Sequence, residues 1–246
     1  MIHRTLVLGG ALLLALALTA PVSAARVTVR VEGASATIFG PTAPRLAPVR
    51  GTFTPPAGPA VSVRGDTPLG ALEAASRRGE FYYRLEAFSF GPYVAQIGRH
   101  AGSGTTGWVF KVNGKSPPVA ADKHVLKAGD NVLWYFSRFG PSGGPKTLHL
   151  RGPIHSVTDC FGKPCANASE RSCYTAYALD DNCRRSSPGR VVFRVDGRSV
   201  GGSMVCPRGD WRALRATKRG FVRSQVVTRP RGGVTAGVAA LTGRAR

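Results

Sequence analysis

The stretch from residue 107 to residue 136 constrains the fold most, because its apolar residues alternate and clear turn signals separate the runs. Trp108, Phe110 and Val112 alternate with other residues, which predicts a strand with one large apolar face. Asn113-Gly114 follows at once and is a strong signal for a tight turn. A second strand is expected at residues 131–136. The stretch therefore predicts a hairpin-like pair of strands that buries aromatic side chains.

One segment of the first half is suited to a helix, residues 66–79. Thr67 is a good N-cap, Pro68 suits the first helical position, and Gly79 is expected to end the helix. Strands are expected around it, at residues 25–33 and 81–88, because apolar residues alternate there. We therefore expect an α+β class, with a β-grasp-like domain over residues 26–138 in which a mixed sheet covers a single helix.

The segments VRVEG, TIFG, DTPLGALEAA, FGPYVAQIG, GWVFKVNG and LKAGDNVLWYF occur in this order along residues 25–136. This series resembles the domain of unknown function 4430 family, also called the transcobalamin-like C-terminal domain. The resemblance implies a β-grasp-type fold related to ligand-binding modules. In the vitamin B12 carriers such a domain closes over one face of cobalamin, but the helical barrel of those carriers is absent here. The resemblance therefore implies a fold and leaves the cofactor unknown.

Aromatic residues of the first half are the candidates for a small-ligand site. Tyr93 and Tyr135 lie off the inward alternating pattern, and Tyr135 is expected on the sheet face opposite Trp134. Trp108 follows the Gly-rich residues 101–107 and completes the candidate set, although it also fits an inward core position. A domain of this size needs large side chains for its core, so both readings remain open.

The sequence of the second half predicts an all-β unit. Residues 139–146 are rich in Gly, Pro and Ser and predict a linker. Short apolar or alternating runs then recur, separated by turn signals, over residues 147–231. They favour an immunoglobulin-like β-sandwich, to which the run from residue 210 to residue 227 is weakly similar. Residues 232–246 are expected to be a disordered tail.

All cysteines lie in this second half: Cys160, Cys165, Cys173, Cys183 and Cys206. In an oxidising compartment they predict two disulfides and one remaining thiol, with Cys173–Cys206 as one candidate across the sandwich. The spacing of Cys160 and Cys165 has no second close pair to complete a zinc site, so no metal is expected.

Positive charge is also concentrated there, with 19 basic and 6 acidic residues after residue 138, in a chain of net charge +21. Such a balance favours polyanionic partners, although the preference for Arg over Lys is also typical of a bacterial genome of high GC content. The candidate polyanion-binding residues are Arg208, Arg212, Arg215, Lys218, Arg219 and Arg223. They do not share one strand face, so a solvated surface is the competing interpretation.

Catalytic motifs are weak. Ser142 lies in a Gly-x-Ser-x-Gly match, but the prolines and glycines around it exclude the strand and helix that a nucleophile elbow needs. His149, downstream of it, is expected to face solvent. We therefore expect no enzymatic activity.

Residues 1–25 have the layout of a secretory signal peptide, with a charged start, an apolar run and small residues near the end. The sequence thus predicts a secreted or cell-wall-associated bacterial protein without a transmembrane segment after cleavage. Its expected function is non-enzymatic binding of a small ligand by the first domain. The alternative is a structural or adhesive protein of the cell envelope that binds acidic polymers through the basic second domain.

Overall fold

The computed structural model describes residues 25–138, 143–156 and 171–229, except for the side chains of residues 153–156, 171 and 172. Residues 1–24 of the expected signal peptide and the expected tail lie outside this part. So do Ser142, Cys160 and Cys165.

Strands dominate the described residues, which form β1 to β18 and a single helix, α1 (Pro68–Gly79). The expected α+β class is therefore wrong, and the protein is nearly all-β. The physical reason lies in the 31 Gly and 18 Pro residues, which interrupt helices but allow short strands between turns. Even the Pro-rich residues 41–63 contain three short strands.

A mixed five-stranded sheet organises the first half. Its order is β2-β1-β10-β9, and β3 is a further partner of β1. β1 runs parallel to β10, and β10 runs antiparallel to β9. The strands of this sheet are β1 (Val27–Glu32), β2 (Thr37–Phe39), β3 (Arg45–Leu46), β9 (Thr106–Val112) and β10 (Asn131–Arg138).

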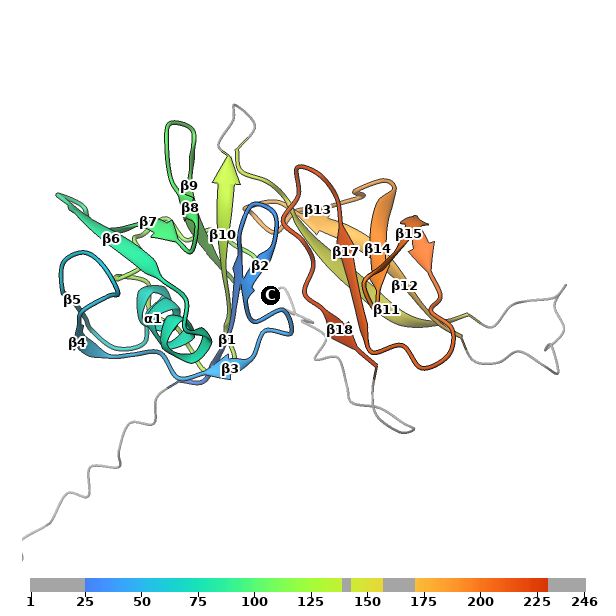
Figure 1. Cartoon of the computed structure of the whole chain (residues 1–246), viewed down its shortest axis with the longest axis horizontal. Coiled ribbons are helices and arrows are strands. Elements are labelled where there is room, and N and C mark those ends of the chain that lie inside the picture. The colour runs from blue at the N-terminus through green and yellow to red at the C-terminus, as the bar shows by residue number, and fades with distance from the viewer. Residues whose placement is uncertain (1–24, 139–142, 157–170, 230–246) are drawn as a thin grey trace, which may run out of the picture.

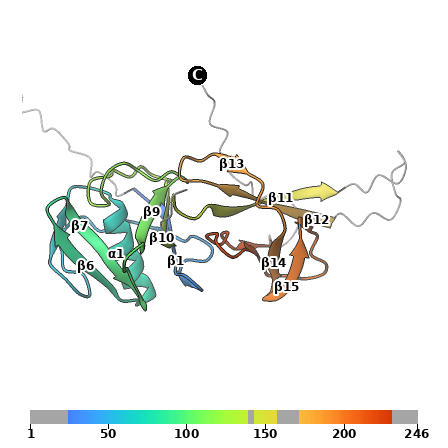
Figure 2. The same cartoon turned by 90° about the horizontal axis from the view of Figure 1, so that it is seen from above.

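Helix α1 covers the face of this sheet that lies away from the second half of the chain (Figure 1, Figure 2). Its start is as predicted: the Thr67 side chain accepts the Gly70 N–H at 3.1 Å, and Pro68 occupies the first turn. Its end is also as predicted, since Gly79 is the last helical residue, and the left-handed backbone, with a φ of 50°, follows at Glu80. The buried side of α1 packs against the inward face of β1 and β10.

Two small sheets complete the first half. Their strands are β4 (Gly51–Phe53) with β5 (Val61–Val63), and β6 (Tyr83–Phe88) with β7 (Gly91–Ile97) and β8 (His100–Ala101). Trp108 and Trp134 are both buried in the shared core, at 2% exposure each. The predicted inward alternation of the aromatic residues is therefore confirmed for these two.

The second half contains two four-stranded sheets that share one apolar core, around Leu148, Tyr174, Phe193 and Leu214. This arrangement is sandwich-like. One sheet contains β11 (Thr147–Ser156), β12 (Arg171–Leu179), β13 (Arg185–Ser186) and β16 (Met204–Val205). The other contains β14 (Val191–Val195), β15 (Arg198–Gly202), β17 (Ala213–Thr217) and β18 (Val227–Thr228).

The disulfide between Cys173 and Cys206 is present, as expected, and ties β12 to the residue that follows β16. Cys183 is a free thiol.

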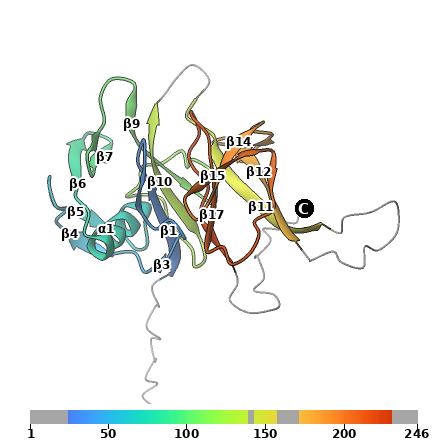
Figure 3. The same cartoon turned by 45° about the vertical axis from the view of Figure 1, so that its right-hand side comes forward.

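The two halves are packed against each other along the face of the first sheet that α1 does not cover (Figure 3). The Val226 N–H donates to the Pro41 carbonyl at 2.7 Å. Tyr135 and Leu133 of β10 form an apolar cluster with Val222 of the second half. This contact places side chains of both halves in one site.

Candidate anion-binding groove

The sheet face toward the second half carries charged residues that alternate with the inward valines of β1 and the inward aromatics of β9. Arg30 and Glu32 lie on β1 and are 4% and 1% exposed. Lys111 lies on β9 and is fully buried. Isolated buried charges are costly, so each of these needs an opposite charge or a hydrogen-bond partner.

Glu32 lies at the centre of the first charged cluster. Its Oε1 accepts hydrogen bonds from Arg30 Nη1 at 3.2 Å and from Arg215 Nη2 at 2.7 Å. Its Oε2 accepts one from Arg223 Nε at 2.9 Å. Thr37 Oγ1 donates to the same carboxylate at 3.0 Å. One carboxylate is thus shared by three guanidiniums, two of which come from the second half.

These arginines also donate hydrogen bonds to groups other than Glu32. Arg30 Nη1 donates to the Arg223 carbonyl at 2.8 Å, and Arg223 Nη2 donates to the Gly33 carbonyl at 2.7 Å. Arg215 donates to the Ser224 carbonyl and to Thr37 Oγ1. The cluster therefore fixes the β1–β2 turn against the loop after β17.

Three positive charges exceed the single negative charge of Glu32, and the pKa values respond to this. Burial, together with repulsion from Arg215 and Arg223, lowers the pKa of Arg30 to about 10, although attraction to Glu32 opposes that shift. The pKa of Arg215 is also lowered, first by burial. The surplus positive charge lies beside the surface groove described below.

A second cluster surrounds Lys111. Its Nζ pairs with Asp181 Oδ1 at 2.8 Å, and it donates to Thr147 Oγ1 at 3.2 Å. It also lies 5.0 Å from the centre of the Tyr135 ring. Burial and the Asp181 carboxylate raise the pKa of Tyr135, so its hydroxyl stays protonated and donates to Asp181 at 3.3 Å.

His149 lies at the same contact between the two halves, near Arg30 and Lys111. It was expected to face solvent, but its ring stacks on Tyr177 at 5.3 Å and its Nε2 is buried without a hydrogen-bond partner among the described residues. Burial, followed by the charges of Arg30 and Lys111, lowers its pKa to about 4. His149 is therefore neutral at physiological pH.

Two adjoining hollows lie along the contact between the two halves, and together we call them the junction groove. The larger has a volume of about 740 Å³ and lies between the β1–β2 turn and strands β14 and β17. The smaller, of about 650 Å³, continues toward residues 143–146. Both are lined by Ala34, Gly220, Phe221 and Arg223.

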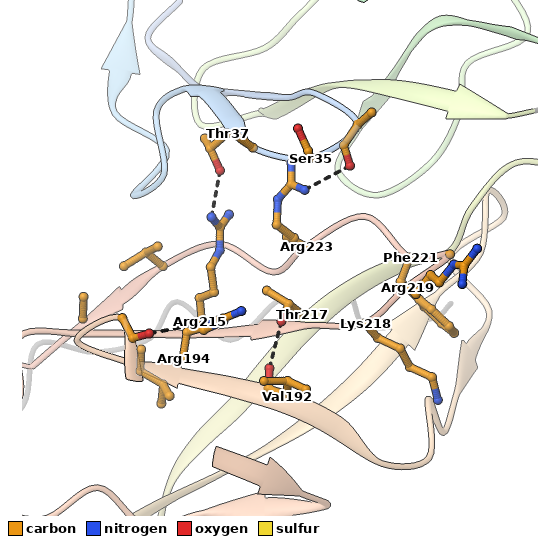
Figure 4. Close-up of a pocket in the computed structure, with 17 residues that line it drawn as sticks. Ser35, Thr37, Val192, Arg194, Arg215, Thr217, Lys218, Arg219, Phe221 and Arg223 are labelled. Carbon is orange, nitrogen blue, oxygen red and sulfur yellow. Dashed lines mark hydrogen bonds between the residues drawn. The ribbon is translucent and has the colours of Figure 1, made fainter. Parts of the chain in front are cut away.

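The lining of the junction groove is strongly basic. Among its described lining residues Glu32 is the one acid, and the cations are Arg138, Lys146, Arg194, Arg215, Lys218, Arg219 and Arg223. Figure 4 shows Arg215 and Arg223 reaching toward the turn that carries Ser35 and Thr37. Arg194 and Arg219 are exposed, and neither has a carboxylate partner among the described residues.

The three aromatic residues predicted to bind a small ligand are not brought together. Trp108 lies in the core of the first half, where its Nε1 donates to the His100 carbonyl at 2.7 Å. Tyr135 lies on the opposite sheet face and is 1% exposed. Tyr93 is on β7, at the far side of the first half, and contacts Phe88.

The six cations predicted to bind a polyanion divide into three groups. Arg215 and Arg223 pair with Glu32. Lys218 and Arg219 line the junction groove, but Lys218 Nζ donates to the Pro188 carbonyl. Arg208 and Arg212 are exposed and do not line it.

Sequence reasoning missed Arg30, Glu32, Lys111 and Asp181. A signal for the first three was present, because charged residues in a strand that is otherwise rich in Val or aromatics are candidates for buried pairs. Their partners could not be read from the sequence, since Arg30 and Arg223 are 193 residues apart.

With this geometry in place, the comparison with protein families can be stated. Residues 65–138 match the family model of the domain of unknown function DUF4430. The match covers α1, the β6–β7–β8 sheet, β9 and β10, and it confirms the predicted resemblance for this segment. A search of curated proteins found no significant match.

Two further searches concern the described residues alone. None of their helices is both long enough and apolar enough to cross a membrane. No three His, Cys, Asp or Glu side chains among them are grouped so that they would hold a metal ion.

Proposed function

We propose that this protein is a non-enzymatic, exported binding protein that holds an acidic polymer in the junction groove. One observation carries the proposal: the single carboxylate that lines the groove, Glu32, is already shared by three guanidiniums. The local field is therefore positive, and an anion that enters the groove meets no unpaired acid among the described lining residues.

The groove favours an extended anion over a compact one. Its two hollows adjoin each other, and their exposed cations come from separate elements: Arg138 at the end of β10, Arg194 on β14, and Arg219 in the loop after β17. Several weak ionic contacts spaced along a chain give useful affinity, whereas a single exposed pair contributes little.

The expected small-ligand site formed by Tyr93, Trp108 and Tyr135 has less support, because the three side chains do not share a surface. The transcobalamin-like relationship and the immunoglobulin-like character of the second half stay predictions. We propose no cofactor from them.

The test uses the full chain and two polymer probes, long-chain polyphosphate and polygalacturonate, titrated over a series of NaCl concentrations. The groove variant is Arg194→Ala with Arg219→Ala. The matched control is Arg78→Ala with Arg99→Ala, which removes the same charge from exposed positions of the first half. We expect the groove variant to weaken binding about tenfold at low salt and to reduce the dependence of log K on log[salt] by about one to two units.

Equal losses in the two variants would mean that affinity follows net charge alone and would contradict the proposal. Binding that does not change with salt would contradict it as well, because ionic contacts with a polyanion release counterions.

A further inference from the structure

An exposed aromatic cluster lies on the hairpin of β6 and β7. This hairpin is at the side of the first half that faces away from the second half (Figure 1). Phe88 and Phe90 are 47% and 65% exposed. Their rings are parallel, with an interplanar angle of 2° and centres 5.2 Å apart. Tyr93 meets the Phe88 ring edge-on at 6.0 Å. We call these three residues the aromatic hairpin. Three rings gathered at a surface are more than the scattered exposed hydrophobic residues of an ordinary protein.

A buried carboxylate lies directly beside this cluster. The Asp122 side chain is 4% exposed, and its Oδ1 has no hydrogen-bond partner among the described residues. Only its Oδ2 is paired, with the exposed Lys123 at 2.9 Å. An unpaired buried acceptor is costly, so its retention needs a reason.

The position of Asp122 is defined by Gly91. Phe88 and Gly91 are cross-strand partners in the hairpin, and directly opposed residues share a sheet face. A Cβ atom at Gly91 would lie 3.5 Å from Asp122 Oδ1. The carboxylate therefore occupies the place that a side chain opposite Phe88 would fill, on the same face as the rings.

From this juxtaposition we infer that the aromatic hairpin and Asp122 form a binding site for a neutral carbohydrate chain. The faces of aromatic rings carry partial negative charge and attract the polarised C–H bonds on the flat side of a sugar ring. A carboxylate oxygen at the edge of such a platform accepts a hydrogen bond from a sugar hydroxyl, and a charge-assisted bond of this kind is strong.

The charges around the site favour a neutral ligand over an anionic one. Glu86 is the cross-strand partner of Tyr93 and therefore lies on the same face, so the rings are flanked by two carboxylates. Each carboxylate is paired with one cation, Glu86 with Arg84 and Asp122 with Lys123, so these described residues offer no surplus positive charge to an anionic lipid surface or an acidic polymer. The site is thus different in chemistry from the junction groove and does not depend on the function proposed for it.

The experiment titrates the full chain with neutral hexasaccharides of β-1,4-linked glucose, β-1,4-linked N-acetylglucosamine and α-1,4-linked glucose by calorimetry. Phe90→Ala is the main variant, since this ring is mostly exposed and its loss should leave the fold intact. Tyr82→Ala is the matched control, because Tyr82 is 41% exposed and lies outside the ring pairs of the hairpin. We expect at least one hexasaccharide to bind, Phe90→Ala to weaken it about tenfold, and Tyr82→Ala to leave it unchanged.

A second variant, Asp122→Asn, keeps the shape of the side chain and removes its charge. It should weaken the same hexasaccharide several-fold without lowering the temperature of thermal unfolding, a result that a purely structural role for Asp122 would not give. Binding should also persist at about 0.5 M NaCl and in the Arg194→Ala with Arg219→Ala variant, which separates this site from the junction groove.

Three outcomes would overturn the inference. The wild-type chain fails to bind all three hexasaccharides at millimolar concentration, or Phe90→Ala and Tyr82→Ala behave alike. In the third outcome, phosphatidylglycerol vesicles capture the wild-type chain in a Phe90-dependent manner while no sugar binds.

Discussion

Changing Glu32 to Gln tests the central electrostatic contact of the molecule. The substitution keeps the length of the side chain and one acceptor oxygen, but it removes the carboxylate that Arg30, Arg215 and Arg223 share. The amide NH₂ would also replace one of the two carboxylate oxygens that now accept hydrogen bonds from Arg215 at 2.7 Å and from Arg223 at 2.9 Å. A donor would then face a donor. Three cations with side-chain exposures of 5%, 15% and 14% would then lie together without a counter-charge.

Removing one partner from a buried ion pair costs about 3–5 kcal/mol, because the other charge stays buried. We expect the free energy of unfolding to fall by this amount. A protein of this size loses about 2–4 °C of melting temperature per kcal/mol, so the melting temperature should fall by roughly 6–20 °C. Urea unfolding followed by tryptophan fluorescence measures the change directly, since both halves contain buried tryptophans.

Glu86→Gln is the matched control, because Glu86 is 41% exposed and pairs with Arg84 at the surface. Its effect should stay within about 0.5 kcal/mol. Sulfate should restore part of the stability of Glu32→Gln and have less effect on the control, since an anion that enters the junction groove partly replaces the lost charge. A loss below about 1 kcal/mol in Glu32→Gln would refute the reasoning, because the three guanidiniums would then be stable without the carboxylate.

Three further predictions concern other parts of the molecule. The pKa of His149 is about 4 in the folded protein and 6.5 in the unfolded chain, so the unfolded chain binds the proton more strongly. The free energy of unfolding should therefore fall as the pH drops from about 6.5 to 4. In His149→Phe the midpoint of urea unfolding should depend less on pH between about pH 7 and pH 4.5 than it does in the wild type. Removing the disulfide by Cys173→Ser with Cys206→Ser should cost about 3–4 kcal/mol in urea unfolding, since the bond closes a loop with a sequence separation of 33; an unchanged midpoint would argue against this. Gly70→Ala should cost about 1–3 kcal/mol, because a Cβ there would lie 2.2 Å from a backbone oxygen of a neighbouring segment, whereas Gly201→Ala has open space and should be neutral in thermal unfolding.

Local features of the fold followed well from the sequence. The N-cap at Thr67 and the alternation that buries Trp108 and Trp134 depend on near neighbours and were predicted correctly. The disulfide between Cys173 and Cys206 was also expected. The predicted fold class is wrong because the one helix has a clear signal, whereas many strands are short and have weak signals. Several of these strands lie in Pro-rich sequence.

The candidate site followed less well, for a reason that Tyr135 illustrates. The sequence correctly predicts its place opposite Trp134 on β10, but it also predicts that this outer face of the sheet is open to a ligand. In the structure the second half covers that face, and Tyr135 is buried against Val222. Alternation tells which residues share a face, and it carries no information on what packs against that face.

The sequence by itself thus determined the strand faces, the start of the single helix and the strongly basic character of the second half. The tertiary structure alone decided which charges became structural. Arg215 and Arg223 look like any other cations in a basic segment, yet the packing of the two halves places them on Glu32, 183 and 191 residues away. Burial of Glu32 made these partners necessary, because a carboxylate removed from water is stable only when cations and hydrogen-bond donors replace its hydration.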